Sequence, residues 1–169
     1  GNDHVLEFMT DYLRLIVSGN TDPHEIGELM EQEMETFKHE GAIPAHSLAR
    51  VGDALPALGI VAAVLGVVHA LASADLPPAE MGQLIAHAMV GTFLGILLAY
   101  GFVSPLGTLI EHKVAESLKI YECIRVTLMA SLNGYAPQLA VEFGRKVLVS
   151  TERPSFSELE SHVRDAKNR

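Results

Sequence analysis

The chain has 169 residues, of which 49% are hydrophobic and 20% charged, and its formal net charge at pH 7 is −9. Its mean hydropathy is nevertheless positive, so apolar and charged residues must be segregated, which argues against an ordinary water-soluble domain. The acidic balance and the absence of tryptophan argue against a nucleic-acid surface, which needs a basic stripe. The single cysteine, Cys123, permits no internal disulfide and fits a reducing compartment.

The first 53 residues form an acidic region with two predicted helices. They carry three basic and eleven acidic residues. Apolar residues recur at helical spacing over Val5–Val17, which predicts an amphipathic helix that ends before Gly19. Pro23 follows a capping aspartate and predicts the start of a second helix. We expect that helix to run to about His39 and to stop at Gly41 and Pro44.

The second helix has a lopsided charge, with six glutamates opposed by Lys38 alone. Two interpretations stay open: a solvated helix face, or an electrostatic docking face for a basic partner. The glutamates are Glu25, Glu28, Glu31, Glu33, Glu35 and Glu40.

Two long segments without Asp, Glu, Lys or Arg follow: 21 residues over 54–74 and 30 residues over 81–110. About 20 apolar residues cross a hydrocarbon core of about 30 Å. We predict an all-α membrane protein built on a two-helix transmembrane hairpin, with spans at about 54–74 and 82–106. The long helices extend into cytoplasmic helical regions.

The short turn at Pro77 and Pro78 has no Lys or Arg, whereas basic residues precede the first span and follow the second. By the positive-inside rule, both ends of the chain face the cytoplasm. The predicted organisation is a cytoplasmic helical region over 1–50, the transmembrane hairpin over 51–110, and a cytoplasmic helical tail over 111–169.

The tail is expected to begin as a helical continuation of the second span over 111–132, which breaks at 133–137. A helix follows over about 137–149. Ser155 and Glu158 have capping-box spacing, which predicts the start of a last helix.

Small residues form one stripe on each span. In the first they accompany Pro56, and in the second Gly91 and Gly95 form a GxxxG pattern. One interpretation is a helix-helix seam, and the other is a surface facing a pore or an enclosed partner helix. The stripes are Gly59, Ala63, Gly66 and Ala70 on the first span, and Ala88, Gly91, Thr92, Gly95 and Ala99 on the second.

Neither span contains a carboxylate or a lysine, the usual side chains of intramembrane ion relays. If the protein moves ions, another chain or segment must supply the ionisable carrier. His69 and His87 lie near the outer ends of the spans, where they either snorkel to the interface or serve proton entry. Pro56 and Pro105 lie near the cytoplasmic ends, as helix punctuation or as a paired hinge.

Soluble catalysis has no support in the sequence. No GxSxG, HExxH, CxxC, P-loop or Rossmann pattern is present. We expect no catalytic residue, no metal site and no cofactor.

Three stretches closely resemble the MotA family, the A subunits of bacterial flagellar stators. Residues 51–66 read VGDALPALGIVAAVLG, residues 90–106 read VGTFLGILLAYGFVSPL, and the tail contains NGYAP at 133–137 and VEFGRK at 141–146. The resemblance covers essentially the whole chain. It implies a piece that begins late in the large cytoplasmic loop and contains the third and fourth transmembrane helices and the tail.

The resemblance implies a stator of the bacterial inner membrane, in which five A subunits surround two B subunits and an aspartate of the B subunit carries the ion. Pro56 and Pro105 match the family's coupling prolines, and Thr92 matches the threonine facing the ion path. Glu33 matches an acidic position with a lesser part in contact with the rotor switch protein.

Ala63 matches a position where sodium-driven relatives have threonine and proton-driven relatives have alanine. The resemblance therefore favours H⁺ over Na⁺, because Na⁺ needs extra oxygen ligands as it sheds water. Two alternatives remain: an energiser of envelope transport of the ExbB or TolQ type, and a structural membrane hairpin that displays an acidic adaptor.

Overall fold

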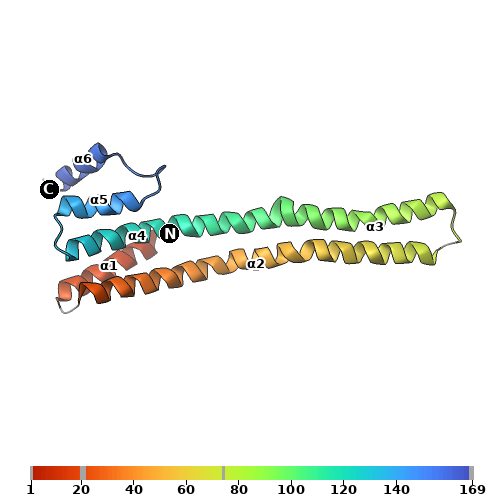
Figure 1. The fold of residues 1–169 in the computed structure, drawn as a ribbon, viewed down its shortest axis with the longest axis horizontal. Coiled ribbons are helices and arrows are strands. Elements are labelled where there is room, and N and C mark those ends of the chain that lie inside the picture. Colours follow the sequence, from red (N-terminus) through yellow and green to blue (C-terminus); the bar gives the residue numbers. More distant parts are fainter. Residues whose placement is uncertain (1, 20–21, 74, 168–169) are drawn as a thin grey trace. The chain divides into compact units, whose positions relative to one another are not determined.

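The computed structural model of the chain describes residues 2–19, 22–73 and 75–167, and every regular element within them is helical (Figure 1). The chain divides into two compact units, Gly1–Glu40 with Val114–Arg169, and Gly41–Lys113. The predicted organisation into regions over 1–50, 51–110 and 111–169 concerns the membrane boundaries and stays a prediction. The elements are α1 (Asn2–Ser18), α2 (Pro23–Ala72), α3 (Pro78–Leu98), the π-helix η1 (Ala99–Val103), α4 (Ser104–Leu132), α5 (Pro137–Val147) and α6 (Phe156–Lys167).

The first unit has an aromatic core. Phe8 and Tyr12 of α1 pack on Tyr121 of α4, with the Phe8 ring 4.8 Å from that of Tyr12 and 5.0 Å from that of Tyr121. Met30 of α2 is fully buried among them. Such edge-on and tilted ring contacts add to the stabilisation from apolar burial. The predicted amphipathic helix over Val5–Val17 is therefore confirmed, and its apolar face supplies this core.

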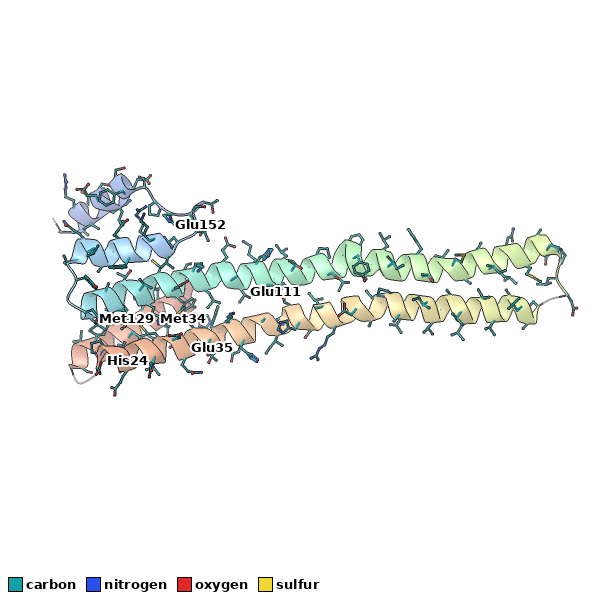
Figure 2. All side chains as sticks on the ribbon, viewed as in Figure 1. His24, Met34, Glu35, Glu111, Met129 and Glu152 are labelled. Atoms are coloured by element: carbon teal, nitrogen blue, oxygen red, sulfur yellow. The ribbon has the colours of Figure 1, made fainter. Side chains whose placement is uncertain are left out.

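A glycine and a methionine bring α2 and α4 close together in the same unit. A side-chain carbon placed on Gly27 would lie 3.0 Å from Cε of Met129, which Figure 2 labels on α4. Gly19 closes α1 with a φ of +74°, and Gly134 follows α4 with a φ of +79°. Glycine adopts this left-handed region without a steric penalty, so both predicted helix ends are confirmed.

Two arginines hold the segment between α5 and α6. Arg145 donates two hydrogen bonds to the Glu142 carboxylate, at 2.7 and 2.6 Å, and one to the Pro154 carbonyl. The bond from Arg145 lowers the pKa of Glu142. Arg153 donates to the carbonyls of Leu148 and Lys146, which fall at the end of α5. These donors satisfy carbonyls that a helix end leaves without an internal partner.

The predicted capping box at the start of α6 is present. The Ser155 amide donates to the Glu158 carboxylate at 2.7 Å, and the Glu158 amide donates to Ser155 Oγ at 3.3 Å. The amide and hydroxyl of Ser155 together lower the pKa of Glu158.

The second unit is a helical hairpin. Its first arm is the part of α2 from Gly41 onward, and its second arm is α3, η1 and the beginning of α4, which run antiparallel to the first (Figure 1). Pro77 and Pro78 start α3, as expected for prolines at a helix N-terminus. The first predicted span ended at residue 74, which lies outside the described residues, and α2 itself ends at Ala72.

The expectation that the second helix stops near Gly41 and Pro44 is wrong, because α2 continues through both. A proline inside a helix costs one hydrogen bond and about 3 kcal/mol. The neighbouring Ala45 is 1% exposed, and its carbonyl would lie 3.4 Å from a side-chain carbon on Gly107 of α4. A break here would open that contact, and we attribute the continuous helix to it.

Candidate functional site

The two arms of the hairpin meet through glycine backbones. A side-chain carbon on Gly59 would lie 2.6 Å from the carbonyl oxygen of Gly91 and 3.2 Å from Cα of Thr92. On Gly95 it would lie 2.6 Å from the Leu55 carbonyl oxygen. No real side chain tolerates such distances to a backbone, so both positions require glycine. We call the contact formed by Gly59, Gly91, Thr92 and Gly95 the glycine seam.

Thr92 is anchored in the glycine seam by a bond between the arms. Its Oγ1 donates to the Gly59 carbonyl at 3.3 Å, and the bond is partly buried. The chemistry of a buried threonine favours the carbonyl four residues back on its own helix, but here the close approach of Gly59 offers the carbonyl of the other arm. The hydroxyl is the polar group that the seam places between the arms.

Ala63 lies at the same level. A side-chain carbon on Gly91 would lie 3.1 Å from Ala62 Cβ and 3.8 Å from the Ala63 amide nitrogen. The structure thus places the backbone of Ala63 near Gly91, the residue that precedes Thr92 in the chain. The sequence placed Ala63 and Thr92 on different helices at 29 residues' separation and gave no measure of their distance.

The stripes of small residues on the two arms continue on both sides of Gly59 and Gly91. A side-chain carbon on Gly66 would collide with Ala88. Ala99 and Ala70 have no exposed surface. In this structure both small stripes are covered by each other, which is the seam arrangement of the two that the sequence left open.

The remaining faces of the hairpin are apolar and uncovered. Leu58 is 62% exposed and Phe93 is 64% exposed, and Figure 2 shows side chains projecting outward along both arms. Both long helices are apolar and long enough to cross a membrane, yet only 11% and 17% of their most apolar windows are buried. The core helix of a soluble protein would be mostly buried, so these faces require lipid or further helices as neighbours. The other outward-facing apolar residues include Ile60, Val61, Val64, Leu65, Val68, Met89, Val90, Leu94 and Phe102.

Pro56 lies within the contact between the arms, between Leu55, which meets Gly95, and Gly59, whereas Pro105 lies beyond the glycine seam. Pro56 is half-buried in α2, and Pro105 is exposed in the first turn of α4. Pro105 is the second residue after the π-helix η1, at whose end the Ser104 amide donates to the Ala99 carbonyl five residues back. No pattern in the sequence predicted η1, although a proline at 105 was a signal that the preceding turn lacks a donor.

His69 and His87 are both exposed. Neither lies in the glycine seam. Their position on the outside of the hairpin agrees with snorkelling side chains and leaves proton entry as a prediction.

Glu33 accepts a hydrogen bond from another helix of the first unit. The Tyr12 hydroxyl donates to the Glu33 carboxylate at 2.7 Å, while Tyr12 itself is 2% exposed. Burial, followed by this bond and the charge of Glu33, raises the pKa of Tyr12. The Glu33 carboxylate remains exposed at the surface. No pattern in the sequence indicates this pairing, because the two residues are on separate helices 21 positions apart.

The other chemically reactive groups form no site. Burial raises the pKa of Cys123, whose thiol lies beside Thr127. Among residues 2–19, 22–73 and 75–167, no group of three or more His, Cys, Asp or Glu side chains is placed to hold a metal ion.

Comparison with known proteins assigns this architecture. The MotA/TolQ/ExbB proton channel family matches residues 2–123. The chain belongs to this family. The match covers the acidic first helices, the glycine seam and both prolines.

Individual relatives agree. Motility protein A of Salmonella typhimurium is 65% identical over 164 residues, covering 97% of this chain and 56% of the relative. A structure of C. jejuni MotAB superposes with a TM-score of 0.80 at 26% identity, covering 88% of this chain and 58% of that one. The flagellar MotAB stator complex of Bacillus subtilis superposes with a TM-score of 0.74 at 27% identity, covering 90% and 57%. The chain thus spans little more than half the length of these relatives.

The predicted fold class is confirmed by these matches. The chain is an all-helical membrane protein of the MotA/TolQ/ExbB family, and its two long apolar helices form a hairpin.

Proposed function

We propose that this chain is part of an A subunit of the bacterial flagellar stator, which couples ion flow across the inner membrane to rotation of the flagellum. The observation that carries the proposal is the charge-free glycine seam with Thr92 at its centre, in a chain 65% identical to a motility protein A. No covalent catalysis and no cofactor enter the proposal.

The transported ion requires a partner. Neither span holds a carboxylate or a lysine, so the ion-carrying group comes from a B subunit whose membrane helix supplies an aspartate. The names of the two structural neighbours, both MotAB, support such a partner. The exposed apolar faces of the hairpin suit lipid on one side and neighbouring helices on another, in a homo-oligomer that we propose is a pentamer.

Proton flow supplies the work, at about 2.3 kcal/mol per charge per 100 mV of membrane potential. Protonation of the partner's aspartate near Thr92 and Ala63 neutralises its charge and changes how its helix packs on the hairpin. Pro56 and Pro105 pass the change toward the cytoplasmic ends. There the acidic side chains of the cytoplasmic helices, Glu33 among them, act on a rotor switch protein.

We also propose an orientation of the chain in the membrane. Both ends of the chain face the cytoplasm, as the basic residues outside the spans indicate. His69 and His87 then lie at the exterior side, near the entry of the proton path.

Complementation tests the proposal. The full-length protein is expressed in bacteria that lack their own motility protein A, and swimming speed is measured. We expect swimming to be restored, and Pro56→Leu or Pro105→Leu to reduce it at least about tenfold while leaving the amount of membrane protein unchanged. No swimming, with restored iron-siderophore uptake in a strain lacking ExbB, would identify an envelope-transport energiser instead.

The choice of ion is tested in the same strain. Ala63→Thr adds an oxygen ligand beside the seam and should lower proton-driven speed or confer dependence on Na⁺. A speed and ion dependence equal to those of the unsubstituted protein would contradict the role of Ala63. For His69→Ala and His87→Ala, an unchanged profile of speed against external pH would leave both histidines as interface residues.

A further inference from the structure

Thr92 differs from other hydroxyl side chains of the long helices in the group to which it donates. Ser47, Thr108 and Thr127 each donate to the carbonyl four residues back on their own helix, as hydroxyls in helices commonly do. Thr92 Oγ1 instead donates to the Gly59 carbonyl of the other arm, at 3.3 Å. A carbonyl has no proton to give, so the direction of this bond is fixed. The hydroxyl proton of Thr92 therefore points into the glycine seam.

The Gly59 carbonyl is shared between two donors. Within α2 it is the helical acceptor of the Ala63 amide, four residues further along the chain. The Thr92 hydroxyl takes the second lone pair of the same oxygen. This approach depends on glycine, because a side-chain carbon at Gly59 would lie 3.2 Å from Cα of Thr92. Gly59 is thus a positioning residue for the Thr92 hydroxyl.

Thr92 and Ala63 lie on one side of the contact between the arms. On the opposite side Gly91 faces Ala62, because a side-chain carbon on Gly91 would lie 3.1 Å from Ala62 Cβ. Consecutive residues of a helix point about 100° apart, so Thr92 and Ala63 both turn away from that side. Thr92 is half-buried, which leaves part of its side chain open to a neighbouring helix.

The open part of Thr92 offers lone pairs only. A hydroxyl has one proton and two lone pairs, and the proton is already donated to Gly59. A group that reaches Thr92 from outside the hairpin must therefore bring a proton or a positive charge. A neutral carboxylic acid meets this requirement, and a carboxylate anion does not, because it carries acceptors alone.

We propose that Thr92 accepts a hydrogen bond from the ion-carrying carboxyl of the partner helix in its protonated state, and that Gly59 fixes this polarity. The proposal rests on the proposed function, which supplies that carboxyl. A carboxylate that takes a proton from water can donate it to Thr92, and returning the proton to water ends the bond. Hydrogen bonding to the neutral form of an acid disfavours its charged form, so Thr92 favours the loaded state of the carrier.

No other side chain of the hairpin titrates near Thr92. The first arm has no titratable residue between Asp53 and His69, and the second arm has none between His87 and Tyr100. All residues of these two stretches belong to the part of the chain that the structure describes. A titration observed at this level of the assembled complex therefore belongs to the partner's carboxyl.

Titration of that carboxyl tests the proposal in the purified full-length complex with its B partner. Infrared spectroscopy follows the C=O band of the protonated acid, which is identified by its loss when the partner's aspartate is replaced by asparagine. Thr92→Val keeps the shape of the side chain and removes the hydroxyl. We expect it to lower the pH of half-protonation by about 0.5–1 unit, the effect of one lost hydrogen bond. Thr92→Ser keeps the hydroxyl and should retain the original value.

Thr108→Val is the matched control, because Thr108 donates to its own helix on the same arm. Its titration should equal that of the unsubstituted complex. A higher pH of half-protonation for Thr92→Val would show that Thr92 donates to the carboxylate, and an unchanged value would show that it does not reach the carboxyl. Either result overturns the proposal. If Thr92→Val fails to co-purify with the B subunit, Thr92→Ala takes its place with the same expectation.

Swimming and titration answer different questions. Swimming of a strain that carries the unsubstituted protein decides the proposed stator function. The shift caused by Thr92→Val is measured on the assembled complex, and it decides which group donates and which accepts whether or not that strain swims.

Discussion

The two units of the chain are stabilised in opposite ways. The first unit buries large side chains, with Phe8, Tyr12 and Tyr121 in ring contact, and carries 17 of the 21 acidic residues. The hairpin of the second unit is held where side chains are absent, at Gly59 and Gly95. The hydrophobic effect drives the first kind of packing in water. Between membrane helices it gives little, and close backbone approach takes its place.

The contrast predicts that larger side chains at the glycines destabilise the hairpin, and that smaller side chains in the aromatic core destabilise the first unit. The largest effect is expected from Gly59→Leu, whose side chain would meet the Gly91 carbonyl. Its cost should exceed the about 1–3 kcal/mol of ordinary overpacking, because the obstacle is backbone. The amount of folded protein in the membrane and its co-purification with the B subunit measure it.

Gly82→Ala is the control for this substitution. With open space around the position, replacing glycine in a helix should stabilise the chain by about 0.5–1 kcal/mol. If both substitutions are tolerated equally, the arms do not meet at Gly59.

Removing atoms from the first unit should have the next largest effect. Phe8 is 2% exposed, and Phe8→Ala should lower the free energy of unfolding by about 3–5 kcal/mol. Leu6→Ala, at a residue 54% exposed on the same helix, should cost far less. Thermal unfolding followed by tyrosine circular dichroism measures both, and equal costs would contradict the aromatic core.

A smaller effect is expected at the bond between Tyr12 and Glu33. Tyr12→Phe removes the donor and should cost about 0.5–1.5 kcal/mol. Burial and the bond to Glu33 raise the pKa of Tyr12. The folded chain therefore keeps the hydroxyl proton to a higher pH than the unfolded chain does. The contribution is fully present below about pH 10 and is lost as pH rises above it.

Tyr12→Phe should therefore lose less stability than the unsubstituted protein as the pH rises above about 10. Tyr135→Phe, at a residue 50% exposed, should follow the unsubstituted protein. Identical alkaline profiles for the two variants would mean that Tyr12 is not protected in the folded chain.

Periodicity and charge were enough to predict most of the fold. The amphipathic α1, the two apolar arms, the break before α5 and the capping box at Ser155 are all local patterns, and local patterns are readable from one sequence. The prediction failed at Pro44, where a contact between Ala45 and Gly107 outweighs the local signal to stop.

The site was less predictable, because it depends on which stripes meet. The sequence identified the small residues but left open whether they face each other or a partner. The distances at Gly59 and Gly91 required the structure. The π-helix was missed because its extra residue changes only the hydrogen-bond register. In a short segment where nearly every residue is apolar, such a change does not alter the pattern of apolar and polar residues.

The most direct test of the account is a cross-link through the glycine seam. Cysteines replace Ala62 and Gly91 in a Cys123→Ala background of the assembled full-length complex. A side-chain carbon on Gly91 would lie 3.1 Å from Ala62 Cβ, and small outward movement reaches the roughly 3.5–4.5 Å of a disulfide. Mass spectrometry should find this pair linked within one chain, and cysteines at the outward-facing Leu58 and Phe93 unlinked. Linkage of the outward pair, with the Ala62 and Gly91 pair free, would contradict the glycine seam.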